Sequence, residues 1–376
     1  MNQNDIISLR HEIHKHPEIS NNEFKTSERI TNFISKFNPD QVINLANTGR
    51  AFIFNGKNTG KTVMFRAELD ALPILENTSV EYSSINNKVA HSCGHDGHMS
   101  ILGGLAKRIS ENLPNYGRVI LLFQPAEEVE QGAIDIINSE EFKSIEPDYI
   151  FALHNIPSVE KHKILIKPNS FTAASKGMTI ELIGKTSHAA EPEKGINPAN
   201  AVSKIIRELY KLINDKSQFR NLALLTFIYV SLGEISFGTS AGNAKMGITL
   251  RAFENKDMEL LTQKSENIIQ SICHEENLEL NICYNEVFPA TVNSDKCVSL
   301  IEHSAKENNY EIEYLTEPFK WSEDVGYFSD KFNAGFFGLG AGIDQPALHN
   351  SNYNFPDDII ETGINMFFNI YKKINL

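Results

Sequence analysis

The stretch TVMFRAEL at residues 62–69 is a short, mostly apolar run followed at once by an acidic residue, Asp70. Two runs of the same character come later in the chain, GRVILLFQ at 117–124 and DYIFALH at 148–154. Apolar runs of this length are typical of buried strands, and the segments near 98–112 and from 132 onward are helical in pattern. Strands that alternate with helices predict βαβ units, and therefore an α/β domain with a mostly parallel sheet.

Polar residues stand at the points where these strands end. Glu68 and Asp70 close the first strand, Glu127 and Glu128 follow the second, and His154 ends the third. Ligands of such sheets bind beyond the carboxyl ends of the strands. The sequence therefore predicts a functional site at this edge of the sheet.

A different pattern runs from 175 to 288. Met178, Ile180 and Leu182 alternate as in a strand, and Asn197-Pro198 marks a helix start with Asn as N-cap. The remaining expected elements are strands at 223–233 and 244–253, a helix near 256–276 and a strand near 278–286. This βαββαβ order is that of a ferredoxin-like module. We therefore expect one discontinuous domain, 1–174 and 289–376, with residues 175–288 inserted into it.

Bulk properties exclude several classes of function. The chain has 376 residues, enough for two domains, and 35 basic against 48 acidic residues give a formal net charge of −13. A field of this sign repels phosphate backbones, so we expect no nucleic-acid partner. No apolar run is long enough for a membrane span, and the N-terminal stretch lacks the apolar core of a signal peptide. Because four cysteines in this length do not suggest a disulfide framework, we expect a cytoplasmic protein.

The densest group of reactive side chains is HSCGHDGH at 91–98. Thiolate and imidazole are natural ligands of zinc and similar cations, so this group predicts metal binding. A polar loop with solvated histidines is the alternative, because short matches to metal motifs are often accidental.

The paired acids of QPAEE at 124–128 follow a strand directly. Adjacent carboxylates point in different directions, so one can bind a metal while the other takes a proton from water. The alternatives are a surface acidic loop for this pair and hydrogen-bonded core histidines for His154 and His349. Taken together, these residues supply the several ligands that a pair of metal ions needs: Cys93, His95, Glu128, His154 and His349, with Glu127 free beside them.

Motifs along almost the whole chain carry a family resemblance. They are LRHEIHKHPE at 9–18, RAELDALP at 66–73, CGHDGH at 93–98, QPAEE at 124–128, ALH at 152–154, GKTSHAA at 184–190, SED at 322–324 and LHN at 348–350. In this order they resemble the aminoacylase and metallo-carboxypeptidase superfamily, and specifically its hippurate hydrolase-like branch. N-acyl-amino-acid amidohydrolases, N-acetyldiaminopimelate deacetylase and indole-acetyl-amino-acid hydrolases belong to that branch.

The resemblance implies a role for each matching residue. Two divalent metal ions per subunit, Zn or Mn first and Co or Ni next, would be held by Cys93, His95, Glu128, His154 and His349. Glu127 matches the general base, Asp70 a carboxylate that orients a metal-bound side chain, and His188 a histidine that meets the substrate carbonyl. Arg251 matches an arginine that binds a substrate carboxylate, for which a solvated strand-end arginine is the alternative. The inserted module would act as a lid that also forms a homodimer.

The chain departs from the branch in three places. Glu68 stands where the branch has Asp, and Val129-Glu-Gln-Gly132 replaces a glycine-rich segment. The Asn-Val-Ile-Pro motif of the lid is absent, and the segment 233–244 is about four residues shorter. That motif helps to shape the substrate pocket, so the departure bears on substrate choice.

The expected reaction is hydrolysis of an N-acyl amino acid by a metal-activated water with Glu127 as the base. A dipeptidase or carboxypeptidase of the same superfamily is the nearest alternative. A non-catalytic binding protein and a papain-like thiol hydrolase using Cys93 are alternatives of other classes. A binding protein would be expected to have lost a ligand, and a thiol hydrolase would survive metal chelation.

Overall fold

The computed structural model describes residues 3–376; the first two residues of the N-terminal stretch discussed above lie outside them. The chain forms two compact units, one made of the chain up to Phe171 with Thr291–Pro318 and Glu323–Leu376, the other of Thr172–Ala290 and Phe319–Ser322. The main stretch of the second unit therefore runs from Thr172 to Ala290. Residues 319–322 join the second unit because Ala173 N donates to the carbonyl oxygens of Phe319 and Trp321, at 3.0 and 3.2 Å.

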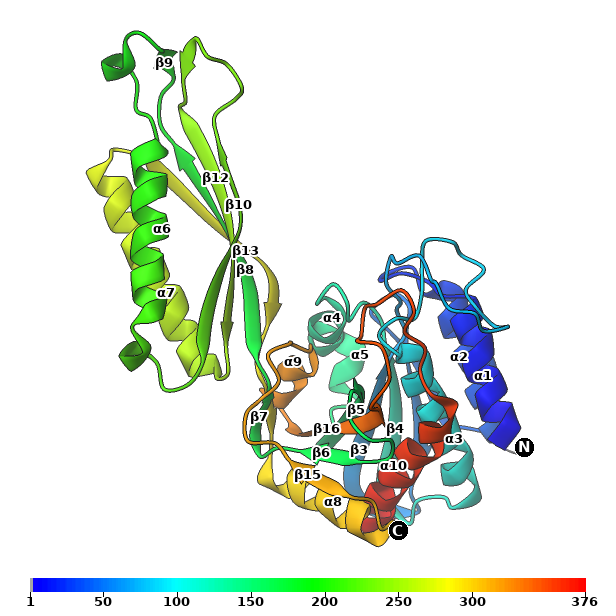
Figure 1. The fold of residues 1–376 in the computed structure, drawn as a ribbon. Coiled ribbons are helices and arrows are strands. Elements are labelled where there is room, and N and C mark those ends of the chain that lie inside the picture. The colour runs from blue at the N-terminus through cyan, green and yellow to red at the C-terminus, as the bar shows by residue number, and fades with distance from the viewer. Residues whose placement is uncertain (1–2) are drawn as a thin grey trace. The chain divides into compact units, whose positions relative to one another are not determined.

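The first unit is built on an eight-stranded sheet (Figure 1). Its strands, in spatial order, are β1 (Gln41–Leu45), β2 (Gly49–Asn55), β4 (Tyr116–Gln124), β3 (Asn58–Glu68), β5 (Tyr149–Pro157), β16 (Asn333–Gly342), β6 (Ile164–Ile166) and β15 (Ile312–Tyr314). The pairs β4–β3, β3–β5, β5–β16 and β6–β15 are parallel, and the others are antiparallel. The predicted α/β class with a mostly parallel sheet is confirmed.

Helices cover both faces of this sheet because its strands alternate apolar residues to either side. Phe65 of β3 packs in a core with α1 (Gln3–Lys15), α2 (Phe24–Ile34), α3 (His95–Glu111), α8 (Asp295–Glu307) and α10 (Ile360–Asn375). Its neighbour Met64 packs in a second core, with α4 (Gly132–Asn138), α5 (Glu140–Lys143) and α9 (Val325–Ser329). Two short strands, β7 (Asn169–Thr172) and β14 (Thr291–Asn293), pair beside the sheet.

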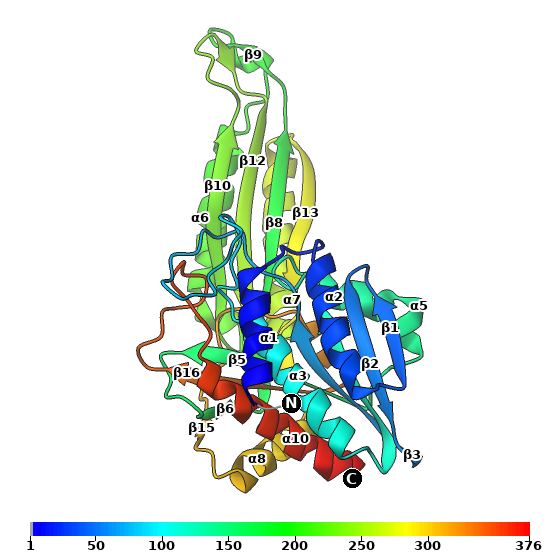
Figure 2. The same ribbon diagram turned by 90° about the vertical axis from the view of Figure 1, so that its right-hand side faces the viewer.

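The second unit has the βαββαβ succession that the sequence predicts. Its elements are β8 (Ala174–Ile183), α6 (Ala199–Asn214), β10 (Ala223–Leu232), β12 (Asn243–Ala252), α7 (Asn255–Glu275) and β13 (Glu279–Phe288). The sheet is antiparallel in the order β10-β12-β8-β13, and α6 and α7 cover one of its faces (Figure 2). A small ribbon of β9 (Ser187–His188) and β11 (Thr239–Ser240) extends from it.

Helix α3 begins three residues earlier than the sequence pattern indicates, at His95 instead of 98. Two glycines allow this start. Gly94 has a left-handed φ of +92°, and a Cβ there would lie 2.6 Å from Asn155 Oδ1. A Cβ on Gly97 would lie 2.4 Å from the Phe355 ring. The glycines therefore let His95 enter the first helical turn while two other segments pack directly against it.

Among residues 3–376, no helix is both long and apolar enough to cross a bilayer.

Candidate metal centre

Three neighbouring parallel strands deliver polar side chains to one place. β3 ends at Glu68 shortly before Asp70, β4 ends shortly before Glu127 and Glu128, and β5 carries His154. The predicted edge of the sheet is therefore where these residues lie. His154 is inside its strand, since β5 continues to Pro157 and pairs with β16 along that length.

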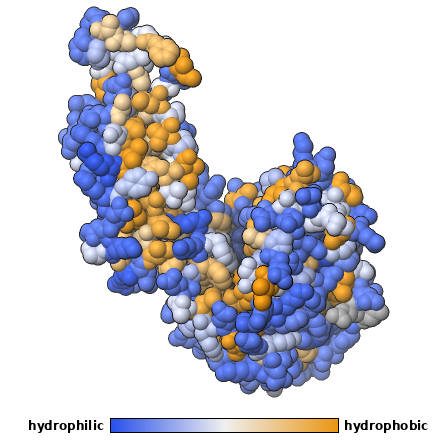
Figure 3. Space-filling view, in the orientation of Figure 1, coloured by the Kyte–Doolittle hydropathy of each residue, from blue (hydrophilic) through white to orange (hydrophobic). Residues whose placement is uncertain are grey.

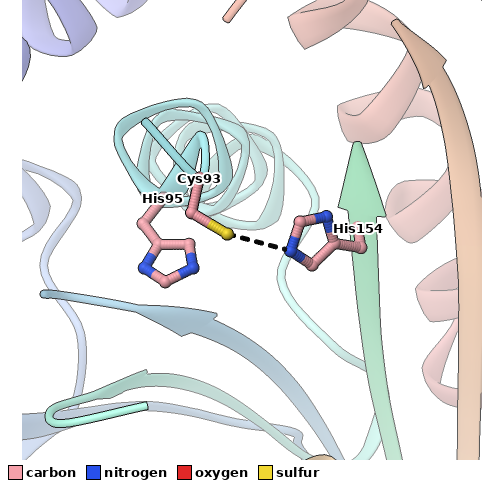
Figure 4. Close-up of side chains that lie close together, drawn as sticks. All are labelled: Cys93, His95 and His154. Carbon is pink, nitrogen blue, oxygen red and sulfur yellow. Dashed lines mark hydrogen bonds between the residues drawn. The ribbon is translucent and has the colours of Figure 1, made fainter. Parts of the chain in front are cut away.

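Cys93, His95 and His154 face one another (Figure 4). Cys93 Sγ lies 3.5 Å from His154 Nε2, and one ligand atom from each of the three residues lies within 4.8 Å of the others. His154 Nδ1 donates to the backbone carbonyl of Asn155 at 3.0 Å. This bond leaves Nε2 with its lone pair directed to Cys93. The arrangement offers one sulfur and two nitrogen ligands to a cation.

Glu128 and His349 extend this group. His349 Nε2 lies 3.6 Å from Glu128 Oε2, and ligand atoms of Cys93, Glu128 and His349 again lie within 4.8 Å of one another. His95 Nε2 is 3.9 Å from Glu128 Oε1 and 3.9 Å from Glu127 Oε2. The structure thus brings together all five predicted ligands and the predicted base.

The Asp70 segment orients His95. The backbone carbonyl of Asp70 accepts from His95 Nδ1 at 2.9 Å, while the carboxylate oxygen Oδ1 is 3.5 Å from the same nitrogen. The carboxylate oxygen Oδ2 accepts from Ser20 Oγ at 2.7 Å and from Glu128 N at 3.0 Å. The main-chain oxygen therefore turns His95 Nε2 toward the paired glutamates, and the carboxylate holds the Glu128 backbone.

The site is rich in buried acids. Its carboxylates are Glu68, Asp70, Glu127, Glu128, Glu323 and Asp324, of which Glu127 is 7% exposed and Glu323 1%. Arg66 is the buried arginine among them: it donates to Gln124 at 2.9 Å, to Glu323 and Asp324 at 2.5 Å each, and to Glu68. One guanidinium does not balance this number of carboxylates.

The excess negative charge is visible in the pKa values. Burial and the neighbouring Glu323 carboxylate raise the pKa of Glu127 well above its usual range. Burial raises the pKa of Glu128 to about 7. Burial alone would lower the pKa of His95, but the surrounding carboxylates, Glu68 first, outweigh it and raise that pKa to about 10. Burial lowers the pKa of His154 to about 3, so this imidazole is neutral and able to coordinate.

Three buried atoms at the centre have no hydrogen-bond partner among the described residues: Asp70 Oδ1, His95 Nε2 and Glu128 Oε1. Leaving such groups unpaired is costly, and nearly all buried polar atoms in proteins have partners. A divalent cation would pair with Glu128 Oε1 and with the deprotonated Nε2 of His95, and it would offset the excess of carboxylates. Sulfur, nitrogen and oxygen donors together suit zinc and similar ions. The residues present therefore fit a divalent metal centre.

The two remaining predicted residues, His188 and Arg251, belong to the second unit. His188 is an exposed residue of β9, opposite Thr239, and its Nδ1 accepts from Ala190 N at 3.1 Å. Arg251 is in β12, where its Nη1 donates to Lys320 O at 2.9 Å and to Ser322 Oγ at 3.0 Å.

Sequence reasoning assigned no role to several residues of the centre. Glu323 and Asp324 stand in the quoted SED motif, but they contact Arg66 across more than 250 positions of sequence, which no local pattern reveals. His98 donates from Nδ1 to Glu68 Oε2 at 2.7 Å. Glu68 itself contacts both Arg66 and His98. These residues stand in the motifs RAELDALP, CGHDGH and SED, and those motifs were the signal in the sequence that could have indicated them.

Comparison with known proteins agrees with this geometry. The sequence matches peptidase family M20/M25/M40 over residues 64–373. It is 30% identical to the hippurate hydrolase of Campylobacter jejuni over 373 residues, 99% of this chain and 97% of that protein. An N-acetyldiaminopimelate deacetylase of Lactobacillus helveticus is 28% identical over 377 residues, 97% of this chain and 96% of that protein.

Solved structures share the fold. A protein of methicillin-resistant Staphylococcus aureus superposes with a TM-score of 0.90 at 22% identity, covering 98% of this chain and 96% of that one. A Bacillus subtilis protein described as a dinuclear metal binding peptidase has a TM-score of 0.84 at 22% identity, covering 98% of this chain and 97% of that one. The resemblance read from the motifs is confirmed: this chain belongs to peptidase family M20/M25/M40, and it is a hydrolase that acts on amide bonds.

Proposed function

We propose that this protein is a metal-dependent amidohydrolase that cleaves N-acyl-L-amino acids to a carboxylate and a free amine. The observation that carries the proposal is that Cys93, His95, Glu128, His154 and His349 bring their ligand atoms close together, with His95 Nε2 and Glu128 Oε1 unpartnered among the described residues and Glu127 beside them. The named activities of the similar hippurate hydrolase and deacetylase support this substrate class. We further propose that the protein works in the cytoplasm.

Two groups of residues would hold the ions. One is Cys93, His95 and His154, and the other is Cys93, Glu128 and His349. Divalent ions bound there would supply Lewis acidity toward the attacking water and the amide carbonyl. We propose Zn or Mn as the metal, with Co or Ni as further candidates, because all of these accept such a donor set.

Glu127 performs the proton transfers in this mechanism. It takes a proton from the attacking water as the new C–O bond forms at the amide carbonyl. It then delivers that proton to the amide nitrogen as the C–N bond breaks, so the amine leaves neutral. The raised pKa of Glu127, caused by burial and by Glu323, suits a carboxylate that must hold a proton between two steps.

The second unit supplies the other proposed roles. We propose that it is a lid and that two chains pair through it, with His188 of one chain stabilising the carbonyl oxygen in its partner's site. Apolar side chains gather on the surface of this unit (Figure 3). They include Ile228, Val230 and Leu232 of the edge strand β10, exposed by 62%, 43% and 42%. An apolar edge strand of this kind is favourable for pairing with a second copy.

Arg251 is proposed to bind the carboxylate of the substrate. Its bonds to Lys320 O and Ser322 Oγ fix the side chain at the end of β12, and a fixed guanidinium suits bidentate recognition of a carboxylate.

The alternatives differ in testable ways. A dipeptidase or carboxypeptidase would use the same centre with a different pocket. A thiol hydrolase using Cys93 is disfavoured because burial and the nearby carboxylates, Glu128 first, raise the pKa of this thiol well above its ordinary value. A purely binding protein does not need Glu127 beside a complete ligand set.

Amine release should depend on a divalent metal. We expect activity of the metal-loaded protein on a panel of N-acyl amino acids, with weaker release from dipeptides. Treatment with a chelator should abolish it, and Mn or Zn should restore it, because the five side chains bring their ligand atoms together and two of those atoms, His95 Nε2 and Glu128 Oε1, have no other partner among the described residues. Full turnover by rigorously metal-free protein would contradict the proposal and would favour the Cys93 thiol.

The paired glutamates should separate into base and ligand. Glu127→Gln should lower kcat by at least about 10²–10⁴-fold, because general-base catalysis is worth that much, while metal content stays near wild type. Glu128→Gln should lower metal occupancy, since Glu128 lies beside both His95 and His349. The measurements are turnover and bound metal for each variant. Equal metal content in the two variants would refute this division of roles.

His188 should act in the partner's site. His188→Ala should keep its metals and lose about 10²–10³-fold in kcat, the usual loss for one oxyanion donor. Mixing it with Glu127→Gln protein under subunit exchange should restore about a quarter of wild-type activity, because half of the dimers are mixed and each has one complete site. If mixed dimers form and remain inactive, His188 does not act in trans.

Arg251 should distinguish charged from neutral substrates. Arg251→Ala should raise KM for N-acyl amino acids, because the substrate carboxylate loses its bidentate partner. The corresponding N-acyl amino acid amides lack that charge and serve as the matched control, with KM little changed. Equal effects on both substrate series would remove Arg251 from the carboxylate site.

A further inference from the structure

The N-terminal motif LRHEIHKHPE at 9–18 has no part in the mechanism above, yet helix α1 places two of its charged groups in the interior. Arg10 and His14 are 0% and 1% exposed. Burying such groups is costly unless they are paired, so their partners indicate what the helix holds.

Arg10 contacts two different segments. Its Nη1 donates to Asp96 Oδ2 at 2.9 Å, and Asp96 directly follows the proposed ligand His95. The same nitrogen donates to Asn354 Oδ1 at 3.2 Å, and Nε donates to Asp357. Asn354 lies in the segment 343–356, and Asp357 begins the short helix that follows it. That segment carries the proposed ligand His349, so one guanidinium joins the two stretches of chain that provide Cys93, His95 and His349.

The His349 segment depends on such contacts because it has neither helix nor strand between β16 and the turn at Asp357–Ile359. His349 itself has a left-handed φ of +65°, which a residue other than glycine adopts only where its surroundings hold it. Its backbone N donates to Ser92 O at 2.9 Å, and the Phe355 ring packs on Gly97. The segment therefore packs against residues 92–97, and Arg10 contacts both stretches.

The two stretches are not equally dependent on Arg10. Asp96 also accepts from His14 Nδ1 at 2.8 Å, and it sits in the first turn of α3, so it keeps a second anchor. Asp357 keeps a contact with His11 at 2.8 Å, but that side chain is 30% exposed and the pair is correspondingly weak. Asn354 also keeps a part-buried hydrogen bond, from its Nδ2 to Tyr82 Oη at 3.1 Å. Since the contacts that remain at Asp357 and Asn354 are less buried than those of Asp96, loss of Arg10 should free the His349 segment more than the Cys93–His95 stretch.

We propose that Arg10 is a positioning residue, which sets the place of His349 relative to Cys93 and thereby the affinity of one of the two metal ions. The inference rests on the proposed metal centre. Removal of a group that orients metal ligands typically costs about 10–100-fold in metal affinity. Without Arg10, the affinity for the ion held by Cys93, Glu128 and His349 should fall by that factor. The affinity for the ion held by Cys93, His95 and His154 should fall little.

The test is a cobalt(II) titration of the metal-free full-length protein, followed by visible absorption and by counting bound ions. We expect wild type to bind two ions. Arg10→Ala should bind the first ion normally and the second about 10–100-fold more weakly. Arg10→Lys should resemble Arg10→Ala, because a single ammonium cannot bond Asp96 and Asp357 as the planar guanidinium does. Asp357→Ala removes a part-exposed partner of Arg10 and should also weaken the binding of the second ion. Because Arg10 itself is unchanged in this variant, it tests the inference even if the Arg10 variants misfold.

Arg108→Ala is the matched control. Arg108 also joins two segments, because from α3 it donates to Asn365 of α10 at 2.6 Å and to Glu361 of the same helix. The Arg108→Ala variant should bind both ions as wild type does. If Arg10 has a purely structural role, its loss should lower the urea midpoint of the metal-free protein and weaken the binding of both ions equally, and that result would overturn the inference. Unchanged metal binding in the Arg10 and Asp357 variants would overturn it as well. Failure of wild type to bind two ions would overturn the metal centre itself, a separate outcome.

Discussion

Buried carboxylates outnumber buried cations where β3, β4 and β5 end, and the rest of the site follows from this imbalance. Arg66 contacts Glu68, Glu323 and Asp324, while Asp70, Glu127 and Glu128 gather around His95. Buried charge of one sign is tolerated only when it is paired or when it coordinates a metal. Burial and the neighbouring carboxylates together raise the pKa of Glu127 and that of the Cys93 thiol well above their usual values.

The fold brings these charged residues together. Parallel strands end at one edge, so residues distant in sequence converge there without a dedicated loop. Gly94 and Gly97 then allow the start of α3 to approach Asn155 and Phe355, which places Cys93 and His95 against His154. Opposite this rigid sheet edge, His349 stands on an irregular segment whose place depends on side-chain contacts. The centre therefore combines two ligands on regular elements, His95 in α3 and His154 in β5, with three on turns: Cys93, Glu128 and His349.

Local sequence patterns predicted the regular elements and the chemically distinctive residues. Apolar runs and their spacing indicated β3, β4, β5 and the βαββαβ order of the second unit, and chemically distinctive residues indicated the five ligands and Glu127. The sequence did not predict that α3 begins at His95, because a left-handed glycine cap leaves no periodic signal. Nor did it predict the contacts of Arg66 with Glu323 and Asp324 or of Arg10 with Asp357, since these join residues hundreds of positions apart. For the same reason residues 319–322 were not expected in the second unit.

The central claim is that Cys93, His95, Glu128, His154 and His349 hold metal ions, with His95 Nε2 and Glu128 Oε1 unpartnered among the described residues. Its most direct test is anomalous X-ray scattering, measured on either side of the absorption edge of the metal, from crystals of the protein grown with Zn or Mn. The account predicts two anomalous peaks, one beside Cys93, His95 and His154 and one beside Cys93, Glu128 and His349. Peaks confined to other acidic residues, or no peak at a metal concentration that supports turnover, would contradict it.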